Sequence, residues 1–237
     1  MKNEIEKIKK WLYEKVSDAK ADGVVFGISG GLDSSVVAKI SVDVFNENAL
    51  GLIMPIHSNK EDEEDAILLS EKINLRYKKV DLSDTYDTLL SSSFNSENLL
   101  AKQNIKPRLR MTTLYYYAQD NNYLVIGPTN KSEFYTGYFT KHGDTGCDLM
   151  PIVDFNKKEV FEIGEILGLP RKILDKKPSA GLYQGQSDEE DMGFSYKILD
   201  SHIEGIEVEK SYKEKIEKMH NSSYHKRSMP QMYKRGE

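Results

Sequence analysis

A glycine- and serine-rich turn near the start of the chain joins a short apolar run to a helix-forming segment. The apolar run covers residues 24–28, and the turn reads Ser29-Gly30-Gly31-Leu32-Asp33-Ser34-Ser35. Glycines let backbone amides approach an anion closely, and the N-terminus of the following helix adds partial positive charge. The serines supply hydroxyl donors. The turn therefore predicts a site for phosphate groups.

Asp33 is the unusual residue of this turn, because a carboxylate repels phosphate. A divalent cation between the carboxylate and the phosphates would remove the conflict. The turn is neither a Walker loop, Gly-x-x-x-x-Gly-Lys-Ser/Thr, nor a Gly-x-Gly-x-x-Gly loop. An ordinary tight turn capped by Asp33 is the simpler alternative, but the whole string between strand and helix favours nucleotide binding.

The string Ser-Gly-Gly-x-Asp-Ser resembles the signature of the PP-loop ATP pyrophosphatases. That resemblance implies cleavage of ATP between its α and β phosphates and adenylation of a substrate oxygen. The superfamily includes NAD, GMP, asparagine and argininosuccinate synthetases and several tRNA-modifying enzymes. The loop alone does not choose among these enzymes.

Outside the loop, the chain resembles the NAD synthetase family along nearly its whole length. Residues 104–111 read Asn-Ile-Lys-Pro-Arg-Leu-Arg-Met, and residues 127–133 read Gly-Pro-Thr-Asn-Lys-Ser-Glu. The remaining matches, in chain order, are residues 136–144, 148–151, 156–157, 177–180, 186–189 and 225–227. Several short strings in the right order are more specific than any one of them.

The resemblance implies an ammonia-dependent ligase that catalyses the last step of NAD biosynthesis. ATP, the co-substrate, would adenylate the nicotinate carboxylate of nicotinic acid adenine dinucleotide and release pyrophosphate. Ammonia would then displace AMP and form NAD. Such a protein must neutralise phosphate charge, position two large ligands and exclude water.

The resemblance also implies roles for residues at matching positions. Magnesium would bind Asp33 and Glu133. The residues implied to bind ATP are Gly27, Ser29, Gly30, Gly31, Asp33, Ser34, Thr129, Lys157 and Ser179. Those implied to bind the dinucleotide are Arg108, Lys141, Asp148, His225 and Lys226. Those implied to act in catalysis are Asp33, Glu133, Asp144 and Lys157.

Several of these roles have structural alternatives. A carboxylate at Asp144 would hold ammonium and help remove its proton, or it would only stabilise the turn between Gly143 and Gly146. Lys157 would otherwise be a solvated lysine at a helix start. His225 would otherwise be a surface histidine in a mobile tail.

Pro128 departs from the family pattern, which usually has threonine directly after the glycine of the fourth strand. Proline offers neither a hydroxyl nor an amide donor. Either the next residue, Thr129, takes over the contact on the adenine side, or one ATP contact is missing. The expected effect is on ATP binding and not on the class of reaction.

Apolar runs alternate with amphipathic segments and predict a parallel sheet. The predicted strands cover residues 24–28, 49–55, 77–82 and 123–127. The predicted helices cover residues 5–16, 36–45, 85–90, 109–118 and 157–167, with another beginning at a Ser58-x-x-Glu61 capping box. We expect one α/β domain over residues 1–237 with helices on both faces, Rossmann-like and of the adenine nucleotide α hydrolase type. Ligands of such folds bind outside the carboxyl ends of the strands.

Composition limits the partners and the location. The chain has 237 residues and a formal net charge of −5, which disfavours nucleic acid as a partner. No apolar run reaches the roughly 18 residues of a membrane span. Cys147 is the single cysteine, which fits a reducing cytoplasm and a buried filler role. We expect no glutaminase domain, free ammonia as the donor, and a homodimer in contact through the tyrosine-rich helix.

Two other hypotheses stay open from the sequence. Another PP-loop adenylating enzyme, such as a tRNA thiolase, usually needs paired cysteines or a basic extension, which this chain lacks. A catalytically impaired nucleotide-binding homologue is supported only by Pro128. The loops at residues 91–98 and 177–190 are candidates for lids that order when substrates bind.

Overall fold

The computed structural model describes residues 1–94, 96–179, 181 and 185–236. Its centre is a parallel sheet with strand order β3-β2-β1-β4. The strands are β1 (Gly23–Gly27), β2 (Ala49–Ile53), β3 (Arg76–Lys79) and β4 (Tyr123–Val125). All four overlap the predicted strands, so the predicted parallel sheet is confirmed, although β3 reads Arg-Tyr-Lys-Lys and is mostly exposed.

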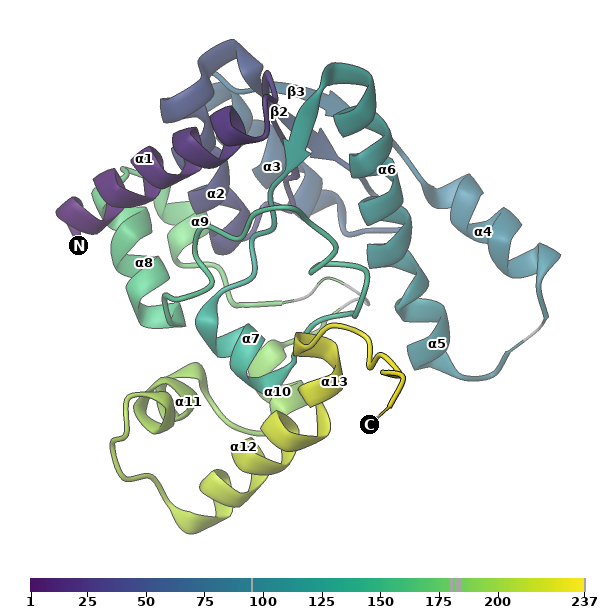
Figure 1. The fold of residues 1–237 in the computed structure, drawn as a ribbon, viewed down its shortest axis with the longest axis vertical. Coiled ribbons are helices and arrows are strands. Elements are labelled where there is room, and N and C mark those ends of the chain that lie inside the picture. The colour runs from purple at the N-terminus through teal and green to yellow at the C-terminus, as the bar shows by residue number, and fades with distance from the viewer. Residues whose placement is uncertain (95, 180, 182–184, 237) are drawn as a thin grey trace.

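Helices cover both faces of the sheet, because successive strand residues point to opposite sides. On one face, Val24 and Phe26 pack in a core formed with α1 (Lys2–Asp18), α2 (Leu32–Phe45), α3 (Lys60–Lys72) and α8 (Lys157–Ile166). On the other face, Val25 and Leu52 pack against α4 (Ser83–Ser92) and α6 (Ile105–Asn121). Figure 1 shows these two groups on opposite sides of the sheet, which confirms the expected fold class.

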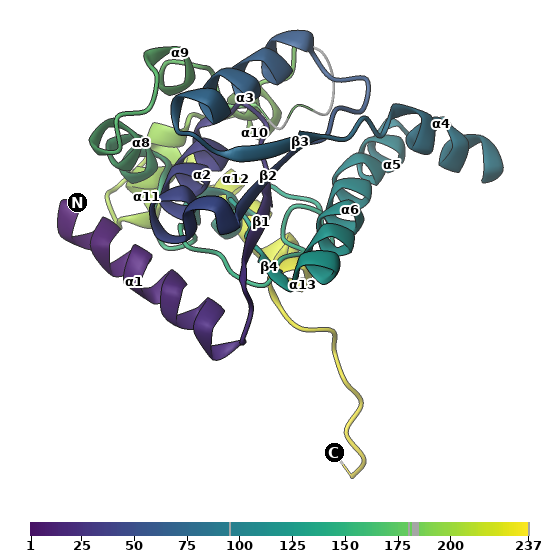
Figure 2. The same ribbon diagram turned by 90° about the horizontal axis from the view of Figure 1, so that it is seen from above.

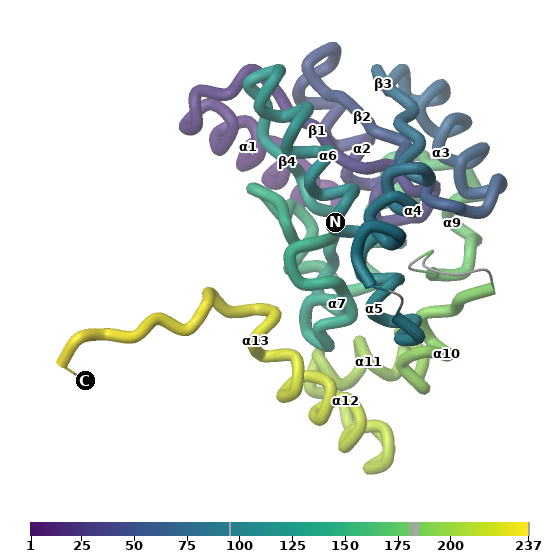
Figure 3. The backbone as a smooth tube through the Cα atoms, turned by 90° about the vertical axis from the view of Figure 1, so that its right-hand side faces the viewer, coloured from purple at the N-terminus to yellow at the C-terminus, as the bar shows by residue number. Residues whose placement is uncertain are grey.

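A smaller helical group lies beside the carboxyl end of the sheet. Met192, Phe194, Leu199 and Ile216 form its apolar core. Its helices are α7 (Lys131–Thr136), α10 (Asp188–Met192), α11 (Tyr196–Ile203), α12 (Lys210–Ser222) and α13 (Tyr224–Arg227). The short helices α5 (Leu99–Gln103), α9 (Arg171–Leu174) and η1 (Asn46–Asn48) lie in connections. Figures 2 and 3 show the residues after α13 running away from the body of the molecule.

Some predicted boundaries were wrong for local reasons. The capping box at Ser58 does not form, because Asn59 is the N-cap of α3 and its side chain accepts the N–H of Glu61 at 3.2 Å. Ser58 Oγ instead accepts the N–H of Ile56 at 3.1 Å. Helix α2 begins directly inside the glycine turn, at Leu32.

A predicted loop contains helix. Helix α4 continues through Ser92, so the start of the expected loop at residues 91–98 is helical. Helix α7 ends at Gly137, which has a φ of 68°. None of the helices in the described part of the chain has both the length and the apolar character needed to cross a bilayer.

Candidate active site

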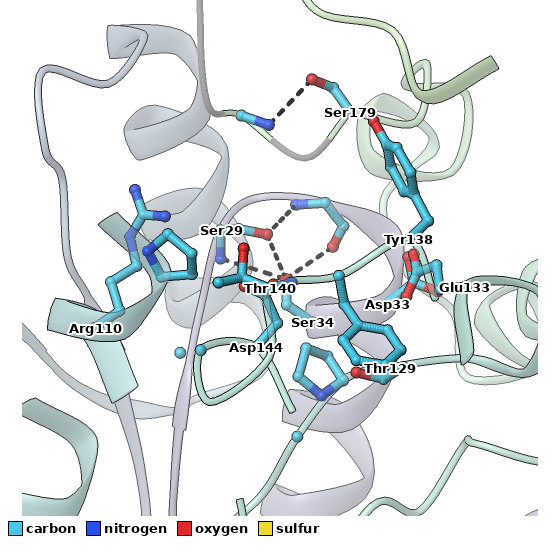
Figure 4. A pocket seen from close by; sticks show the side chains of 18 of the residues that line it. Ser29, Asp33, Ser34, Arg110, Thr129, Glu133, Tyr138, Thr140, Asp144 and Ser179 are labelled. Carbon is cyan, nitrogen blue, oxygen red and sulfur yellow. Dashed lines mark hydrogen bonds between the residues drawn. The ribbon is translucent and has the colours of Figure 1, made fainter. Parts of the chain in front are cut away.

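A cavity of about 960 Å³ opens at the carboxyl ends of β1, β2 and β4. Figure 4 shows its centre, where Ser29 and Ser34 lie between the pair Asp33 and Glu133 on one side and Arg110 on the other. Such an edge is where ligands bind in open parallel sheets. The turn, residues 127–129 and residues 143–147 all contribute to the wall, so the loops converge as the sequence predicts.

The turn between β1 and α2, which we call the PP-loop (residues 29–35), is held by its own hydroxyl groups. Ser34 Oγ accepts the N–H of Ser29 at 3.3 Å and donates to the carbonyl of Gly31 at 3.0 Å. Ser35 Oγ donates to the same carbonyl at 2.7 Å. These bonds hold the shape of the loop, and Gly31 lines the cavity without a side chain.

Gly30 is the position of the PP-loop where only glycine fits. Its φ is +75°, and an added Cβ would lie 2.5 Å from the carbonyl oxygen of Asp62 and 3.0 Å from Cβ of Asp65. Both neighbours belong to α3. The close approach fixes the loop against this helix.

Three predicted site residues meet beside the PP-loop. Lys157 Nζ forms an ion pair with Asp33 and lies 3.9 Å from Glu133 Oε1. Asn130 Nδ2 donates to Asp33 Oδ1 at 2.9 Å. The side chains of Lys157, Asp33 and Glu133 are 11%, 17% and 19% exposed. The interpretation of Lys157 as a solvated lysine is therefore wrong.

Helix starts place these groups. Glu133 lies in the first turn of α7, where it forms a capping box with Asn130. Lys157 begins α8, whose N-cap Asn156 forms a second capping box with Glu159. Ser132 Oγ accepts the N–H of Lys157 at 3.0 Å and so joins the two helix starts. Each box fixes the direction in which its helix leaves the loop, and with it the direction of the site side chain.

The charges of this group influence each other strongly. Burial and the neighbouring carboxylate of Asp33 raise the pKa of Glu133, against the opposing effect of Lys157. Burial lowers the pKa of Lys157, but the two carboxylates outweigh it, so the pKa of Lys157 is raised. Two carboxylates held around one cation form a donor set that suits a hard divalent ion. Within the described residues, no cluster of three or more metal-binding side chains occurs.

Four of the five residues implied to bind the dinucleotide, all but Asp148, lie near one another. Arg108 Nε donates to the carbonyl of Lys141 at 3.3 Å, and Lys141 Nζ donates to the carbonyl of His225 at 2.6 Å. Lys226 Nζ donates to the carbonyls of Gly137 and Phe139, each at 2.8 Å. Of the five implied residues, Lys226 alone is among the described residues that line the cavity.

Asp148 is held by the protein itself. Its Oδ2 accepts the N–H of Val125 at 2.8 Å, and its Oδ1 accepts the hydroxyl of Tyr115 at 2.9 Å. Burial, together with Asp148, raises the pKa of Tyr115. Tyr117 packs in the core beneath α6, whereas Tyr116 is 74% exposed. The structure thus gives Tyr115 and Tyr117 internal roles and leaves Tyr116 on the surface.

Asp144 lines the cavity and also holds its own turn. Its Oδ2 accepts the N–H of Thr140 at 2.8 Å, and Thr140 Oγ1 donates to Asn104 Oδ1 at 2.7 Å. The two alternatives for this residue are therefore compatible with each other. Thr129 is 2% exposed and lines the cavity next to Pro128. Ser179 lines it as well, and its Oγ accepts the N–H of Gly181 at 3.2 Å.

Three lining residues were not singled out from the sequence. Arg110 Nε donates to the carbonyl of Met54 at 3.0 Å. Tyr138 donates its hydroxyl proton to Asp191 at 2.8 Å. Lys176 forms ion pairs with two carboxylates of α3. Arg110 and Tyr138 lie inside matched strings, which was an available signal, whereas the partners of Lys176 are distant in the sequence.

Comparison with known proteins gives consistent matches over almost the whole chain. The NAD synthase family model matches residues 4–236. The chain is 50% identical to the NH(3)-dependent NAD(+) synthetase of Finegoldia magna over 96% of this chain and 94% of that protein. Among solved structures, an NMN synthetase from Francisella tularensis is 40% identical with a TM-score of 0.94, covering 98% of both chains. An NH3-dependent NAD synthetase from Campylobacter jejuni is 30% identical with a TM-score of 0.84, again covering 98% of both chains.

Proposed function

Since the chain belongs to the NAD synthase family, we propose that it is an ammonia-dependent NAD synthetase. ATP would adenylate the carboxylate of nicotinic acid adenine dinucleotide, with loss of pyrophosphate, and ammonia would replace AMP to form the amide of NAD. The observation that carries the proposal is the meeting of Asp33, Glu133 and Lys157 at the PP-loop, whose own hydroxyl groups hold its shape.

The proposed ATP site is the PP-loop together with the buried residues around it. The amides and hydroxyls of residues 29–34 would receive the phosphates, and Thr129 and Ser179 line the same cavity. The ammonium group of Lys157 would form an ion pair with the phosphates when ATP binds. Because Pro128 has no amide proton, Thr129 is the nearest residue able to replace the missing donor.

The proposed magnesium ligands are Asp33 and Glu133. Their donor set fits the ion, since magnesium prefers oxygen ligands and commonly binds one or two carboxylates together with phosphates. When bound, the ion would neutralise charge on the phosphates. Asn130 and Lys157 hold the carboxylate of Asp33 in place, which supports this proposal.

The dinucleotide would extend from the cavity toward the group formed by Arg108, Lys141 and His225, with Lys226 between the two regions. Asp144 faces the cavity close to this path and would hold ammonium and accept its proton. Asp144 Oδ2 accepts the N–H of Thr140, which fixes the carboxylate, and Oδ1 would be the oxygen that receives the ammonium.

We also propose free ammonia as the nitrogen donor, a single domain without a glutaminase, a homodimer and a cytoplasmic location. The chain covers 94% of an ammonia-dependent relative, which supports the first two points. The exposed Tyr116 on α6 supports a contact between copies through that helix. A single cysteine suits a reducing compartment.

A second candidate is NMN synthesis by the same chemistry on the mononucleotide. The high similarity to an NMN synthetase favours it. The greater identity to a dinucleotide-using relative favours NAD synthesis.

One assay tests both candidates. Purified protein with ATP, magnesium and ammonium would receive either nicotinic acid adenine dinucleotide or nicotinic acid mononucleotide, and NAD, NMN and AMP would be measured. NAD formation with matching AMP release is the expected result. Preferential amidation of the mononucleotide would establish the second candidate, and release of AMP without either amide would contradict both.

A further inference from the structure

A fully buried carboxylate lies behind the PP-loop. The side chain of Asp65, on α3, is 1% exposed and binds two lysines from a distant part of the chain. Lys172 Nζ lies 2.6 Å from its Oδ1, and Lys176 Nζ lies 2.6 Å from its Oδ2. A buried charge is stable only when it is paired, so Lys172 fixes α9 and Lys176 fixes the following segment against α3.

Lys176 does more than neutralise Asp65. Its Nζ also lies 2.7 Å from Asp62 and 3.5 Å from the carbonyl oxygen of Gly30 in the PP-loop. Its side chain is 24% exposed and lines the cavity. Lys172 reaches the same carboxylate at the same distance, but it is 48% exposed and is not among the lining residues.

The acidic side chains create a problem for a phosphate site. An added Cβ on Gly30 would lie 2.5 Å from the backbone oxygen of Asp62 and 3.0 Å from Cβ of Asp65. Because Lys176 Nζ reaches both carboxylates and the carbonyl oxygen of Gly30, the carboxylates also lie close to the loop that would receive ATP. Without a counter-charge, their carboxylates would repel the phosphates. Lys176 supplies that charge at the point where α3, the PP-loop and the cavity meet.

The segment that begins at Lys176 also carries Ser179, which lines the cavity three residues later. Holding Lys176 in place therefore determines where this segment crosses the mouth of the phosphate site. The pairing joins three parts of the chain that are far apart in sequence.

We propose that Asp65 and Lys176 act as one positioning unit for ATP. Their ion pair anchors residues 176–179 beside the PP-loop, and the charge of Lys176 offsets part of the negative charge of Asp62 and Asp65 there. The inference rests on the proposed ATP site, but it does not depend on which substrate is amidated. The role of Lys176 in this proposal is to position the segment through Asp62 and Asp65, and comparison of Asp65→Asn with Lys176→Met separates that role from direct binding of phosphate.

The test is ATP binding measured by calorimetry with magnesium, without any second substrate. The variants are Asp65→Asn, Lys176→Met and the double variant, with Lys172→Met as the matched control. We expect each single variant to weaken ATP binding roughly tenfold, as for coupled neighbours. The double variant should be no weaker than Lys176→Met, and the control should stay within about twofold of the wild type.

Binding of nicotinic acid adenine dinucleotide by the same variants separates positioning from general damage, because it should remain unchanged. Thermal unfolding checks that each variant folds. If Asp65→Asn does not fold, the variant Lys176→Arg is measured in its place. Because it keeps the positive charge beside Asp65, it should retain most of the ATP affinity that Lys176→Met loses.

Three results would overturn the proposal. Normal ATP binding by Lys176→Met would remove the role of the pair. Normal binding by Asp65→Asn with loss in Lys176→Met would make Lys176 a direct phosphate ligand. Equal loss in Lys172→Met would reduce the cluster to general stability. Because no amide product is measured, failure of NAD synthesis would leave these comparisons intact.

Discussion

Replacing Lys157 by methionine tests the charge arrangement at the centre of the site. Methionine keeps the length of the side chain and removes its charge, which leaves Asp33 and Glu133 facing each other. Removing one partner of a buried ion pair costs about 3–5 kcal/mol. Lys157 and Asp33 are 11% and 17% exposed, so residual hydration places the expected cost at the lower end, near 3 kcal/mol.

For a chain of this size, each kcal/mol corresponds to about 2–4 °C in melting temperature. Lys157→Met should therefore melt roughly 6–12 °C below the wild type in metal-free buffer, measured by circular dichroism. The control is Lys10→Met, which removes a lysine that is 77% exposed and lies 3.8 Å from Glu14. That control should stay within about 2 °C of the wild type.

The loss of stability in Lys157→Met, relative to the wild type, should also depend on pH. In the wild type, burial and Asp33 raise the pKa of Glu133, while Lys157 opposes the rise. The variant loses that opposition, so Glu133 binds a proton more tightly in the folded state than in the unfolded state. When the pKa of a carboxyl group is higher in the folded than in the unfolded state, the free energy of unfolding of the protein falls as the pH increases. The deficit should thus be larger at pH 8 than at pH 5.

Magnesium provides the second measurement. If the ion binds Asp33 and Glu133, it replaces the missing charge and should raise the melting temperature of Lys157→Met more than that of the wild type. A ligand at a hundredfold excess over its dissociation constant adds about 2.7 kcal/mol. Two results would refute this account of the site. One is an equal rise of melting temperature with magnesium in both proteins, and the other is a Lys157→Met variant with the same melting temperature as the Lys10→Met control.

Three further predictions concern other parts of the site. Gly30→Ala should lower ATP affinity by at least about tenfold in calorimetry, since it combines left-handed strain of about 1–2 kcal/mol with a clash. Its control is Gly168→Ala, where φ is +71° and no atom lies within 4 Å of the added Cβ, so only the melting temperature should fall. Cys147, whose pKa burial raises to about 12, should react with iodoacetamide at pH 8 far more slowly in the folded than in the urea-unfolded protein; similar rates by mass spectrometry would contradict this. Arg227 donates to Ser223 Oγ and to the carbonyl of His220, both at 2.5 Å, and so holds α13, which carries His225 and Lys226. Arg227→Met should therefore raise KM for the dinucleotide but not for ATP. An exposed control, Arg235→Met, should change neither KM.

The sequence could predict the strands and the meeting of the phosphate residues, because both follow from local patterns. Short apolar runs between helix signals have few structures other than buried strands. Once the strands are parallel, their carboxyl ends share one edge. Asp33 and Glu133 therefore approach each other, although they are 100 positions apart in the sequence. The contact through Lys157 adds what a pattern could not give, namely which cation fills the space between them.

What the sequence could not predict depends on packing between distant helices. The ion pair of Asp65 with Lys176 requires α3 and the end of α9 to meet, and neither residue type nor spacing specifies that meeting. Likewise, Ser58 and Asn59 are both good N-caps, and the choice between them depends on the path of the preceding loop. The family strings drew attention to Arg108 and Lys141, but not to their position outside the lining of the cavity.

The charged groups implied to bind substrate are already satisfied by the protein itself. Lys157 binds Asp33, Lys141 binds a carbonyl of α13, and Lys226 binds two carbonyls at the end of α7. In the proposed function, arriving phosphates and carboxylates would have to replace these internal partners, and the net gain in free energy would be smaller than the new contacts alone would give. Ion pairs with phosphate are stronger than bonds from lysine to a neutral carbonyl, so the exchange at Lys141 and Lys226 would favour an anionic ligand over a neutral one. On this proposal, selectivity for phosphorylated substrates would follow from the internal pairing as well as from the cavity itself.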